Sequence, residues 1–344
     1  MKSNINKLGK LIIMMIPLIM IIMFQISCTG EWRENEWEDE QYEKYISFVR
    51  SGYNDTYLNT NTADGMVHYK IPIVVSGSTN NNRDITVTVA LDPDTLVDYN
   101  KATFFTRTDL YYRQLAERHF TFPKGMNVVI PAGKNTGTLD VDFRIGDLDL
   151  VEKYIMPLKI SSTSDYIPSP RKDYKKTLMR VVPFNYFSGN YSAGAAIIIL
   201  DSVRRDNPTT VATREMRYVN DSTIFFYAGL CEETARDRAT YKIRARFNAD
   251  NTVTLTADSA SIQLNPILKD ASGKERCVWT IKEEMDVLQP FLMIRTLTMD
   301  IYYSYMDVTN PSFKIKYFVD GSYTLERRRN TQIPEEDQQE IFDW

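Results

Sequence analysis

Histidine and cysteine are scarce in this sequence, and their scarcity narrows the chemistry that it can support. The 344 residues include two histidines and three cysteines. Most zinc sites, catalytic triads and general-base sites recruit at least one histidine, whereas His68 and His119 have no Asp, Glu or Cys at ligand spacing nearby. Patterns typical of phosphate loops, nucleophile elbows and calcium loops are also missing. We therefore expect no metal site, no cofactor and no catalytic residues, and predict that the protein is not an enzyme.

Long apolar runs are missing too, apart from one near the N-terminus. It extends from Leu11 to Phe24, which is 14 residues, and three lysines precede it. A helix needs about 20 residues to cross a membrane, so this run suits the apolar region of a secretory signal peptide. Ser27 followed by Cys28 fits a lipoprotein signal peptidase site. We expect a signal peptide over residues 1–27 and a lipid on Cys28; the alternative is a plain secretory signal cleaved elsewhere.

Basic side chains are also few relative to acidic ones once this signal is removed. The remaining 317 residues carry 38 basic and 45 acidic side chains, a balance of −7, which argues against nucleic acid or an anionic membrane surface as partner. Between Glu31 and Lys44, seven carboxylates outnumber two basic side chains. Such a segment cannot build a core, so we expect an acidic, solvated tether over residues 28–50 that contacts the membrane only through its lipid.

Two cysteines remain after the lipidation site. Cys231 and Cys277 could form one disulfide, because a secreted chain folds in an oxidising compartment. Two separately buried thiols are an equally good interpretation.

Alternation of apolar and polar residues dominates the first half of the mature chain. Residues 68–75 and 85–91 show this period of two, which predicts β-strands. Further strands are expected over residues 127–130, 137–144, 152–160 and 176–182, and short helices over residues 93–99 and 109–118. Several short strands separated by turns favour an immunoglobulin-like β-sandwich with short helical insertions over residues 51–184.

The second half reads as a run of strands without crossover helices. We expect eight of them, over residues 191–200, 213–219, 222–228, 239–247, 252–257, 276–284, 295–306 and 313–328. Eight sequential antiparallel strands can close on themselves, which removes exposed edges. The predicted fold is therefore all-β, with a lipocalin-like β-barrel over residues 185–329 and an acidic tail over residues 330–344; a second sandwich is the alternative to the barrel.

Both halves resemble a family of Bacteroidetes lipoproteins. The first half resembles an N-terminal lipoprotein domain of unknown function, also found ahead of chitinase-like endoglycosidases, and the second resembles the uncharacterised β-domain that usually follows it. The resemblance lies in these segments: Ala90-Leu91-Asp92, Val97-Asp98-Tyr99-Asn100, Val129-Ile130-Pro131-Ala132-Gly133, residues 154–160, Gly189-Asn190-Tyr191, residues 321–327 and residues 330–334.

The resemblance implies a location and a role. Such lipoproteins are encoded in polysaccharide-utilisation loci, where many are thought to capture glycans for an outer-membrane transporter and its partner lipoprotein. An acidic stretch after the lipidated cysteine resembles the signal that sends them to the outer face of the outer membrane. The implied location is therefore the outer membrane, lipid-anchored and facing the cell exterior.

Carboxylate pairs are the one catalytic pattern that needs no histidine. Glycoside hydrolysis takes two of them, and residues 140–142 and 147–152 superficially resemble the Asp-x-Asp-x-Glu signature of those endoglycosidases. The expected Glu positions hold Arg144 and Val151, and Glu152 comes one residue late, on the other strand face. We interpret these acids as a solvated strand face and a turn.

Aromatic residues are abundant, with 21 Tyr, 16 Phe and 4 Trp. Sugars stack their C–H faces on such rings, and Tyr303 and Tyr305 fall on one strand face, so these two and Trp279 are candidate ligand contacts. Core packing is the competing interpretation. We predict a non-catalytic glycan-binding surface lipoprotein; the alternatives are a structural or adhesin-like protein that binds protein partners, or an unrecognised glycoside hydrolase.

Overall fold

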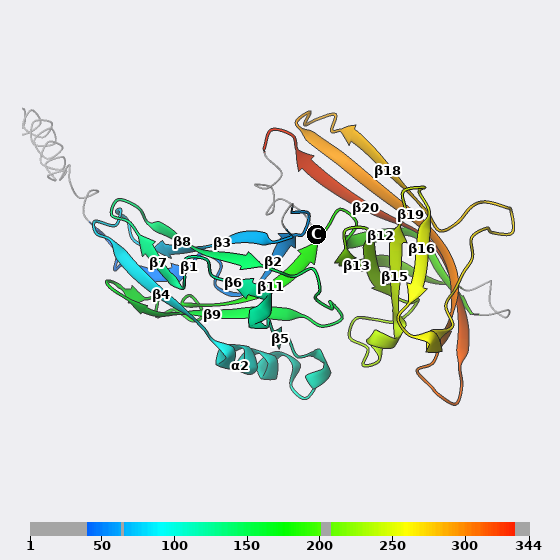
Figure 1. The fold of residues 1–344 in the computed structure, drawn as a ribbon, viewed down its shortest axis with the longest axis horizontal. Coiled ribbons are helices and arrows are strands. Elements are labelled where there is room, and N and C mark those ends of the chain that lie inside the picture. The colour runs from blue at the N-terminus through cyan, green and yellow to red at the C-terminus, as the bar shows by residue number, and fades with distance from the viewer. Residues whose placement is uncertain (1–39, 63–64, 201–207, 334–344) are drawn as a thin grey trace, which may run out of the picture.

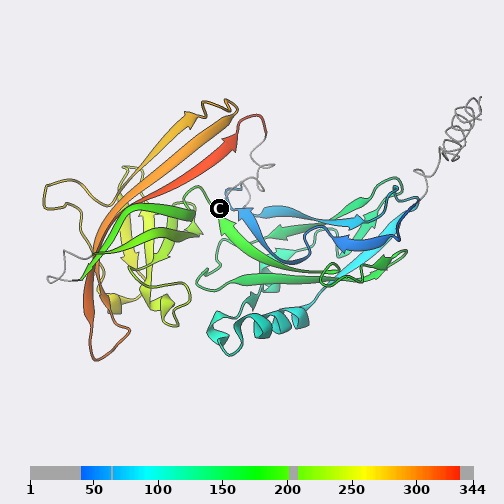
Figure 2. The same ribbon diagram turned by 180° about the vertical axis from the view of Figure 1, so that it is seen from behind.

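The structure is a computed structural model, and it describes residues 40–62, 65–200 and 208–333. Two β-rich halves lie one after the other along the long axis of the molecule (Figure 1; Figure 2 shows the reverse side). We call β1–β11 the N-terminal half and β12–β20 the C-terminal half. Within these described ranges, no helix is long and apolar enough to cross a membrane.

Eleven strands form the N-terminal half. They are β1 (Tyr45–Phe48), β2 (Gly52–Asn59), β3 (Val67–Val75), β4 (Ile85–Leu91), β5 (Arg113–Gln114), β6 (Phe120–Thr121), β7 (Asn127–Ile130), β8 (Thr136–Phe143), β9 (Tyr154–Thr163), β10 (Ile167–Pro168) and β11 (Lys176–Phe184). One sheet has the order β10-β1-β3-β8-β6, and the other has the order β2-β11-β9-β4-β7 with β5 paired to β9. The two sheets share one hydrophobic core.

The alternation in the sequence is what builds this core. In β4, Ile85, Val87 and Val89 are buried, while the threonines between them point outward. The all-β prediction is confirmed. The immunoglobulin-like sandwich is not, because the sheets are curled and contain the parallel pairs β1–β10 and β2–β11.

Helix α2 (Pro93–Phe104) lies where the first helical insertion was predicted. Pro93 occupies its first turn, where its missing N–H costs nothing. The Asp92 carboxylate just before it accepts from the Thr95 hydroxyl at 2.5 Å and pairs with Lys159 at 3.1 Å. On the side facing the sheet, Tyr99 stacks on Tyr53 of β2.

The second predicted helix, over residues 109–118, is wrong. The segment forms two 3-10 turns, Thr108–Leu110 and Glu117–His119, with β5 between them. Arg113 pairs with Tyr154 of β9, and Leu115 is buried in the core. Sheet hydrogen bonds and burial therefore outweigh the local helical preference.

Nine strands form the C-terminal half. They are β12 (Gly189–Leu200), β13 (Thr209–Asn220), β14 (Thr223–Tyr227), β15 (Lys242–Phe247), β16 (Val253–Ala257), β17 (Asn265–Pro266), β18 (Val278–Met285), β19 (Leu292–Asp307) and β20 (Ile315–Asn330). Two 3-10 turns, Arg238–Tyr241 and Ala260–Ile262, interrupt them. The order is β16-β15-β14-β13-β12-β20-β19-β17, with β18 also paired to β19.

This sheet is antiparallel and largely sequential, as predicted, but an eight-stranded lipocalin-like barrel is not confirmed. The paired order ends at β16 on one side and at β17 on the other. A single isolated bridge, Thr252 to Val278, connects the start of β16 with β18. Closing the sheet into a barrel would require a continuous ladder between β16 and β18. One bridge does not provide it, so the sheet is curled but not closed by a ladder there.

Strand β14 contributes side chains to the cores of both halves. All five of its residues are buried, with Phe226 in the C-terminal core and Phe225 and Tyr227 packed in the cluster that fills the N-terminal half. This two-sided burial explains why β14 is a continuous apolar run rather than an alternating one.

The turn between β18 and β19 stands apart from both cores. Val287 and Leu288 at its tip are 93% and 90% exposed. The Asp286 carboxylate accepts hydrogen bonds from the backbone N–H of Leu288 at 2.7 Å and of Gln289 at 2.9 Å. The tip is thus an ordered turn that presents two aliphatic side chains to solvent.

Candidate functional site

A hollow of about 350 Å³ lies at the junction of the two halves, between the β2–β11 edge and strands β12 and β13. Figure 1 shows the ends of these strands meeting in the middle of the molecule. The lining residues are Tyr57, Leu150, Glu152, Lys153, residues 180–183, residues 188–190, Thr213 and residues 215–217. Charged and hydroxyl side chains therefore share its wall with apolar ones.

Arg180 lines the N-terminal side of this hollow and pairs with Asp55. They are register partners in the parallel pair β2–β11. Arg180 Nε lies 2.8 Å from Asp55 Oδ1, and Nη2 donates to Asp55 Oδ2 at 2.9 Å. Burial alone would lower the pKa of the Arg180 guanidinium, but Asp55 and the surrounding groups raise it above its ordinary value. Arg180 is thus a fixed, charged donor.

Tyr57 extends the same wall along β2. It lies two residues beyond Asp55 and therefore projects from the same face of the strand. Burial raises the pKa of its hydroxyl, and the Asp55 carboxylate adds to that effect. The half-buried ring and its hydroxyl combine an apolar face with a polar group.

Arg217 holds the C-terminal side in place. Its Nη1 donates to the carbonyl oxygen of Leu150 at 2.7 Å, and its Nη2 donates to Glu215 at 3.0 Å and to Glu233. Lys153 of the N-terminal half pairs with the same Glu233 at 2.7 Å. One ion pair, Lys153–Glu233, and one hydrogen bond, from Arg217 to Leu150, therefore cross the junction at this wall.

The Glu233 carboxylate stays ionised in this network. Burial alone would raise its pKa, but the Arg217 guanidinium and the Lys153 ammonium lower it to about 2. Arg217 itself has a raised pKa, because the Glu215 and Glu233 carboxylates outweigh the effect of burial. Such mutually stabilised charges keep the wall polar without a ligand.

One more ion pair and two hydrogen bonds join the halves beside the hollow. Lys242 Nζ lies 2.8 Å from Asp149, and Arg238 donates to the carbonyl oxygen of Asp109 at 2.9 Å. Arg107 donates to the carbonyl oxygen of Thr234 at 2.7 Å. These contacts hold the two sides of the hollow at a set separation.

The aromatic residues predicted to bind ligand lie in the core instead. Tyr303 and Tyr305 are buried within the C-terminal sheet, and their hydroxyls accept from the backbone N–H of Gly229 and Leu230. Trp279 packs edge-on against Phe247. None of the three lines the hollow, so the competing core interpretation fits them better.

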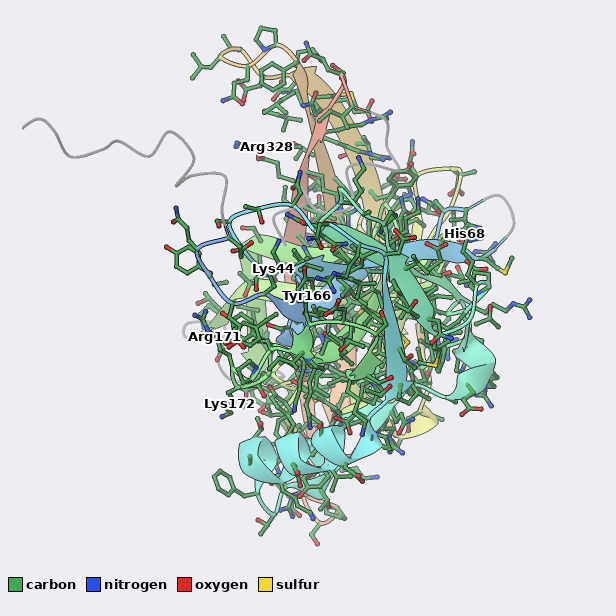
Figure 3. The ribbon with its side chains drawn as sticks, turned by 90° about the vertical axis from the view of Figure 1, so that its left-hand side faces the viewer. Lys44, His68, Tyr166, Arg171, Lys172 and Arg328 are labelled. Carbon is green, nitrogen blue, oxygen red and sulfur yellow. The ribbon has the colours of Figure 1, made fainter. Side chains whose placement is uncertain are left out.

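The remaining predicted residues are placed as follows. Cys28 lies outside the described residues. Cys231 and Cys277 are both free thiols, so the possible disulfide is absent and the alternative of two separate thiols holds. His68 of β3 pairs with Asp142 at 2.7 Å and lies on the opposite side of the molecule's end from Arg171 and Lys172 (Figure 3).

No metal site emerges from these side chains. Among residues 40–62, 65–200 and 208–333, no group of three His, Cys, Asp or Glu side chains is arranged to hold a metal ion. Asp140 pairs with Lys124 at 2.5 Å, and its side chain is only 15% exposed, so the prediction of a solvated strand face is wrong at this residue. Glu152, by contrast, lines the hollow and pairs with Arg113 at 3.1 Å.

A second hollow, of about 420 Å³, lies at the end of the N-terminal half where the described chain begins. Lys44 and Tyr166, which line it, are close together in Figure 3. Its Glu40 carboxylate already accepts from the Ser78 and Thr79 backbone N–H groups and pairs with Lys44. These contacts fasten the start of the described chain, at Glu40, to a loop, so the junction hollow is the better candidate site.

Sequence reasoning missed the residues of the junction. The signal that could have found them is an arginine inside a buried strand: Arg180 interrupts the apolar run of β11. A buried arginine requires a partner. The pairing with Asp55, 125 residues earlier, could not be read from the spacing.

Two family models match the chain. One, described as a domain of unknown function, DUF4973, matches residues 37–164, and a second, described as a C-terminal domain, matches residues 175–324. The first match confirms the predicted resemblance to a domain of unknown function. No curated protein matches the chain.

Solved structures from Bacteroides are similar over nearly the whole chain. One of unknown function from Bacteroides ovatus is 34% identical with a TM-score of 0.75, covering 87% of this chain and 100% of that one. Another, from Bacteroides thetaiotaomicron and named an auxiliary nutrient binding protein, is 30% identical with a TM-score of 0.74, covering 85% and 96%. The chain therefore belongs to the family of these Bacteroides proteins and carries the DUF4973 domain and the C-terminal domain in that order.

Proposed function

We propose that this protein is a non-catalytic, cell-surface glycan-binding lipoprotein that captures an oligosaccharide for an outer-membrane import system. The observation that carries the proposal is the junction hollow, in which fixed polar side chains and a tyrosine ring surround about 350 Å³. That volume is within the range of small-molecule sites, which are often found between domains. The 30%-identical relative named an auxiliary nutrient binding protein supports the same role.

The chemistry of the wall suits a sugar. Hydroxyl groups both donate and accept, so they pair with guanidinium groups and with carboxylates alike. Arg180 and Arg217 supply donors, Glu215 supplies acceptor oxygens, and the Tyr57 ring supplies a surface on which a C–H face can stack. Because these groups are held by ion pairs before a ligand arrives, little ordering is required on binding.

The position of the hollow suits capture at a cell surface. The described chain begins at Glu40, at the end of the N-terminal half that lies farthest from the C-terminal half (Figures 1 and 2). If Cys28 carries a lipid, the N-terminal half separates the hollow from the membrane. The transporter and its partner lipoprotein are the proposed recipients of the oligosaccharide.

A glycoside hydrolase is the second candidate, because Glu152 and Glu215 both line the hollow. Hydrolysis needs one carboxyl group with a raised pKa as general acid. Glu152 and Glu215 instead each pair with an arginine, Arg113 at 3.1 Å and Arg217 at 3.0 Å. We therefore favour capture over cleavage.

The test is a binding and turnover screen of the purified chain, residues 29–344, against plant and host glycans, with products followed by chromatography. Capture requires retention without cleavage, and Tyr57→Ala should weaken it about tenfold or more, since stacking on an aromatic ring is lost. Tyr174→Ala, an exposed tyrosine outside the hollow, is the matched control.

Other outcomes would reassign the protein. Cleavage that Glu152→Gln or Glu215→Gln abolishes would establish a hydrolase. Failure to bind any glycan would contradict the proposal and favour the structural or adhesin-like alternative.

A further inference from the structure

We infer that the junction hollow selects neutral oligosaccharides and rejects those that carry carboxylate or sulfate groups. This inference rests on the proposed function and adds the class of glycan. It is carried by the charges of the wall, which are compensated within the protein.

Each of the five charged side chains that line the hollow has an oppositely charged partner. The pairs and their separations are Arg180–Asp55 at 2.8 Å, Lys153–Glu233 at 2.7 Å, Glu152–Arg113 at 3.1 Å and Arg217–Glu215 at 3.0 Å. Arg217 also contacts Glu233. No cation in the wall is therefore left uncompensated.

An acidic glycan would find no such cation to pair with. Sites that bind carboxylate or sulfate groups use the planar fork of arginine, which donates two parallel hydrogen bonds. Asp55 accepts one hydrogen bond from Arg180 Nη2 and lies 2.8 Å from Arg180 Nε, and Arg217 divides its fork between Leu150 and carboxylates. An anionic ligand would have to displace an internal carboxylate.

Repulsion adds to the effect of this internal pairing. Glu215 is 48% exposed and Glu152 also lines the hollow, so carboxylate oxygens are part of the surface that a ligand meets. A neutral sugar hydroxyl can donate to these oxygens, whereas an anionic group can only repel them. Wall composition therefore favours hydroxyl groups over anions.

The inference predicts how the wall can be changed. Asp55→Asn keeps the shape of the side chain but removes its charge, which leaves the Arg180 guanidinium uncompensated in the hollow. Affinity for an acidic glycan should then rise about tenfold relative to the unaltered protein, as one new ion pair in a partly buried site would give. Glu215→Gln should act in the same direction and serves as the second variant if the first fails to fold.

Asp258→Asn is the matched control. Asp258 is as exposed as Asp55, at 30% against 31%, and it also pairs with an arginine through two contacts, Arg244 Nε at 2.5 Å and Nη2 at 2.8 Å. The arginine that Asp258 pairs with, Arg244, does not line the hollow, whereas Arg180, the partner of Asp55, does. Loss of this pair should leave the affinity for both classes of glycan unchanged.

The experiment is calorimetric titration of the mature chain and the three variants with matched probes. Each acidic oligosaccharide, such as a hexagalacturonate or a glucuronoxylan fragment, is paired with its carboxyl-reduced or methyl-esterified form, and neutral gluco-, manno- and xylo-hexaoses complete the panel. Unfolding midpoints verify that each variant is folded.

The outcomes distinguish the inference from the proposed function. Binding of neutral probes only, with a gain for acidic probes in Asp55→Asn or Glu215→Gln and none in Asp258→Asn, is the expected result. Preference of the unaltered protein for an acidic probe over its neutral form overturns the inference and leaves glycan capture intact. Binding of no probe in either class overturns both.

Discussion

The Tyr305 hydroxyl accepts a hydrogen bond from the backbone N–H of Leu230 at 3.3 Å, and its ring occupies the space beside Gly229. Gly229 has a φ of +49°, which residues with a Cβ rarely adopt. A Cβ built there would overlap the Tyr305 ring and hydroxyl. The turn after β14 and the core strand β19 therefore depend on each other.

Gly229→Ala should destabilise the protein by about 2–4 kcal/mol, because left-handed strain and overpacking of a buried ring add together. Urea unfolding followed by circular dichroism measures the loss. Gly273→Ala is the control, since Gly273 also has a positive φ, +85°, but nothing lies within 4 Å of its Cβ position. It should cost about 1 kcal/mol; equal losses for both variants would show that packing against Tyr305 contributes nothing.

Arg217→Met should destabilise the protein by about 3–5 kcal/mol. The change leaves Glu233 with one cation fewer and removes the donor to the Leu150 carbonyl across the junction. Denaturant unfolding of the variant is compared with that of Arg328→Met. Arg328 is exposed and pairs only loosely with Glu326, at 3.4 Å, so its loss should change stability by less than about 0.5 kcal/mol.

Acid should weaken the junction through Glu233. Its pKa in the folded protein is lowered from 4.5 to about 2, with Arg217 and Lys153 overcoming the opposing effect of burial. A lowered carboxyl pKa means that the unfolded state binds more protons, so this stabilisation is fully present above pH 4.5 and is lost as the pH falls from 4.5 towards 2. Unfolding midpoints measured across that window should decline less steeply for Glu233→Gln.

Lys153→Met tests the cause of that pH dependence. Removing one of the two cations beside Glu233 should reduce the slope of midpoint against pH over the same window, though less than Glu233→Gln does. An unchanged slope in both variants would assign the acid sensitivity to other carboxylates.

Asp286→Ala should loosen the β18–β19 turn without unfolding the protein. It removes the acceptor for the Leu288 and Gln289 backbone N–H groups, in a turn whose neighbouring side chains are exposed. We expect faster hydrogen exchange at these two amides and a change in global stability below about 1 kcal/mol. Unaltered exchange at both amides would mean that the backbone alone orders the turn.

Much of the strand pattern could be predicted from the sequence. Residues that alternate in the chain, such as Ile85, Val87 and Val89, alternate between core and solvent, and eight predicted strands of the second half overlap observed ones. The helix over residues 109–118 failed because its backbone pairs with β9. The sequence of residues 109–118 carries no signal that identifies β9, much later in the chain, as their pairing partner.

The candidate site could not be predicted for a related reason. Arg180 and Arg217 belong to different halves, and their proximity depends on how the halves pack. Tyrosine is frequent both in cores and in binding sites, so Tyr303 and Tyr305 could not be distinguished from Tyr57 by residue type. Their positions in the folded sheets distinguish them: Tyr303 and Tyr305 point into a core, whereas Tyr57 lines the hollow.

Strands β19 and β20 are hydrogen-bonded from Leu292–Asn330 at one end to Asp307–Ile315 at the other. Sixteen residues at about 3.3 Å each make a ribbon of about 50 Å. Tyr305 clamps one end of it in the core, while Val287 and Leu288 extend beyond the other. Because β12 pairs with β20 and β18 pairs with β19, a force applied at the exposed tip is shared by these ladders before it reaches Tyr305 and the turn at Gly229.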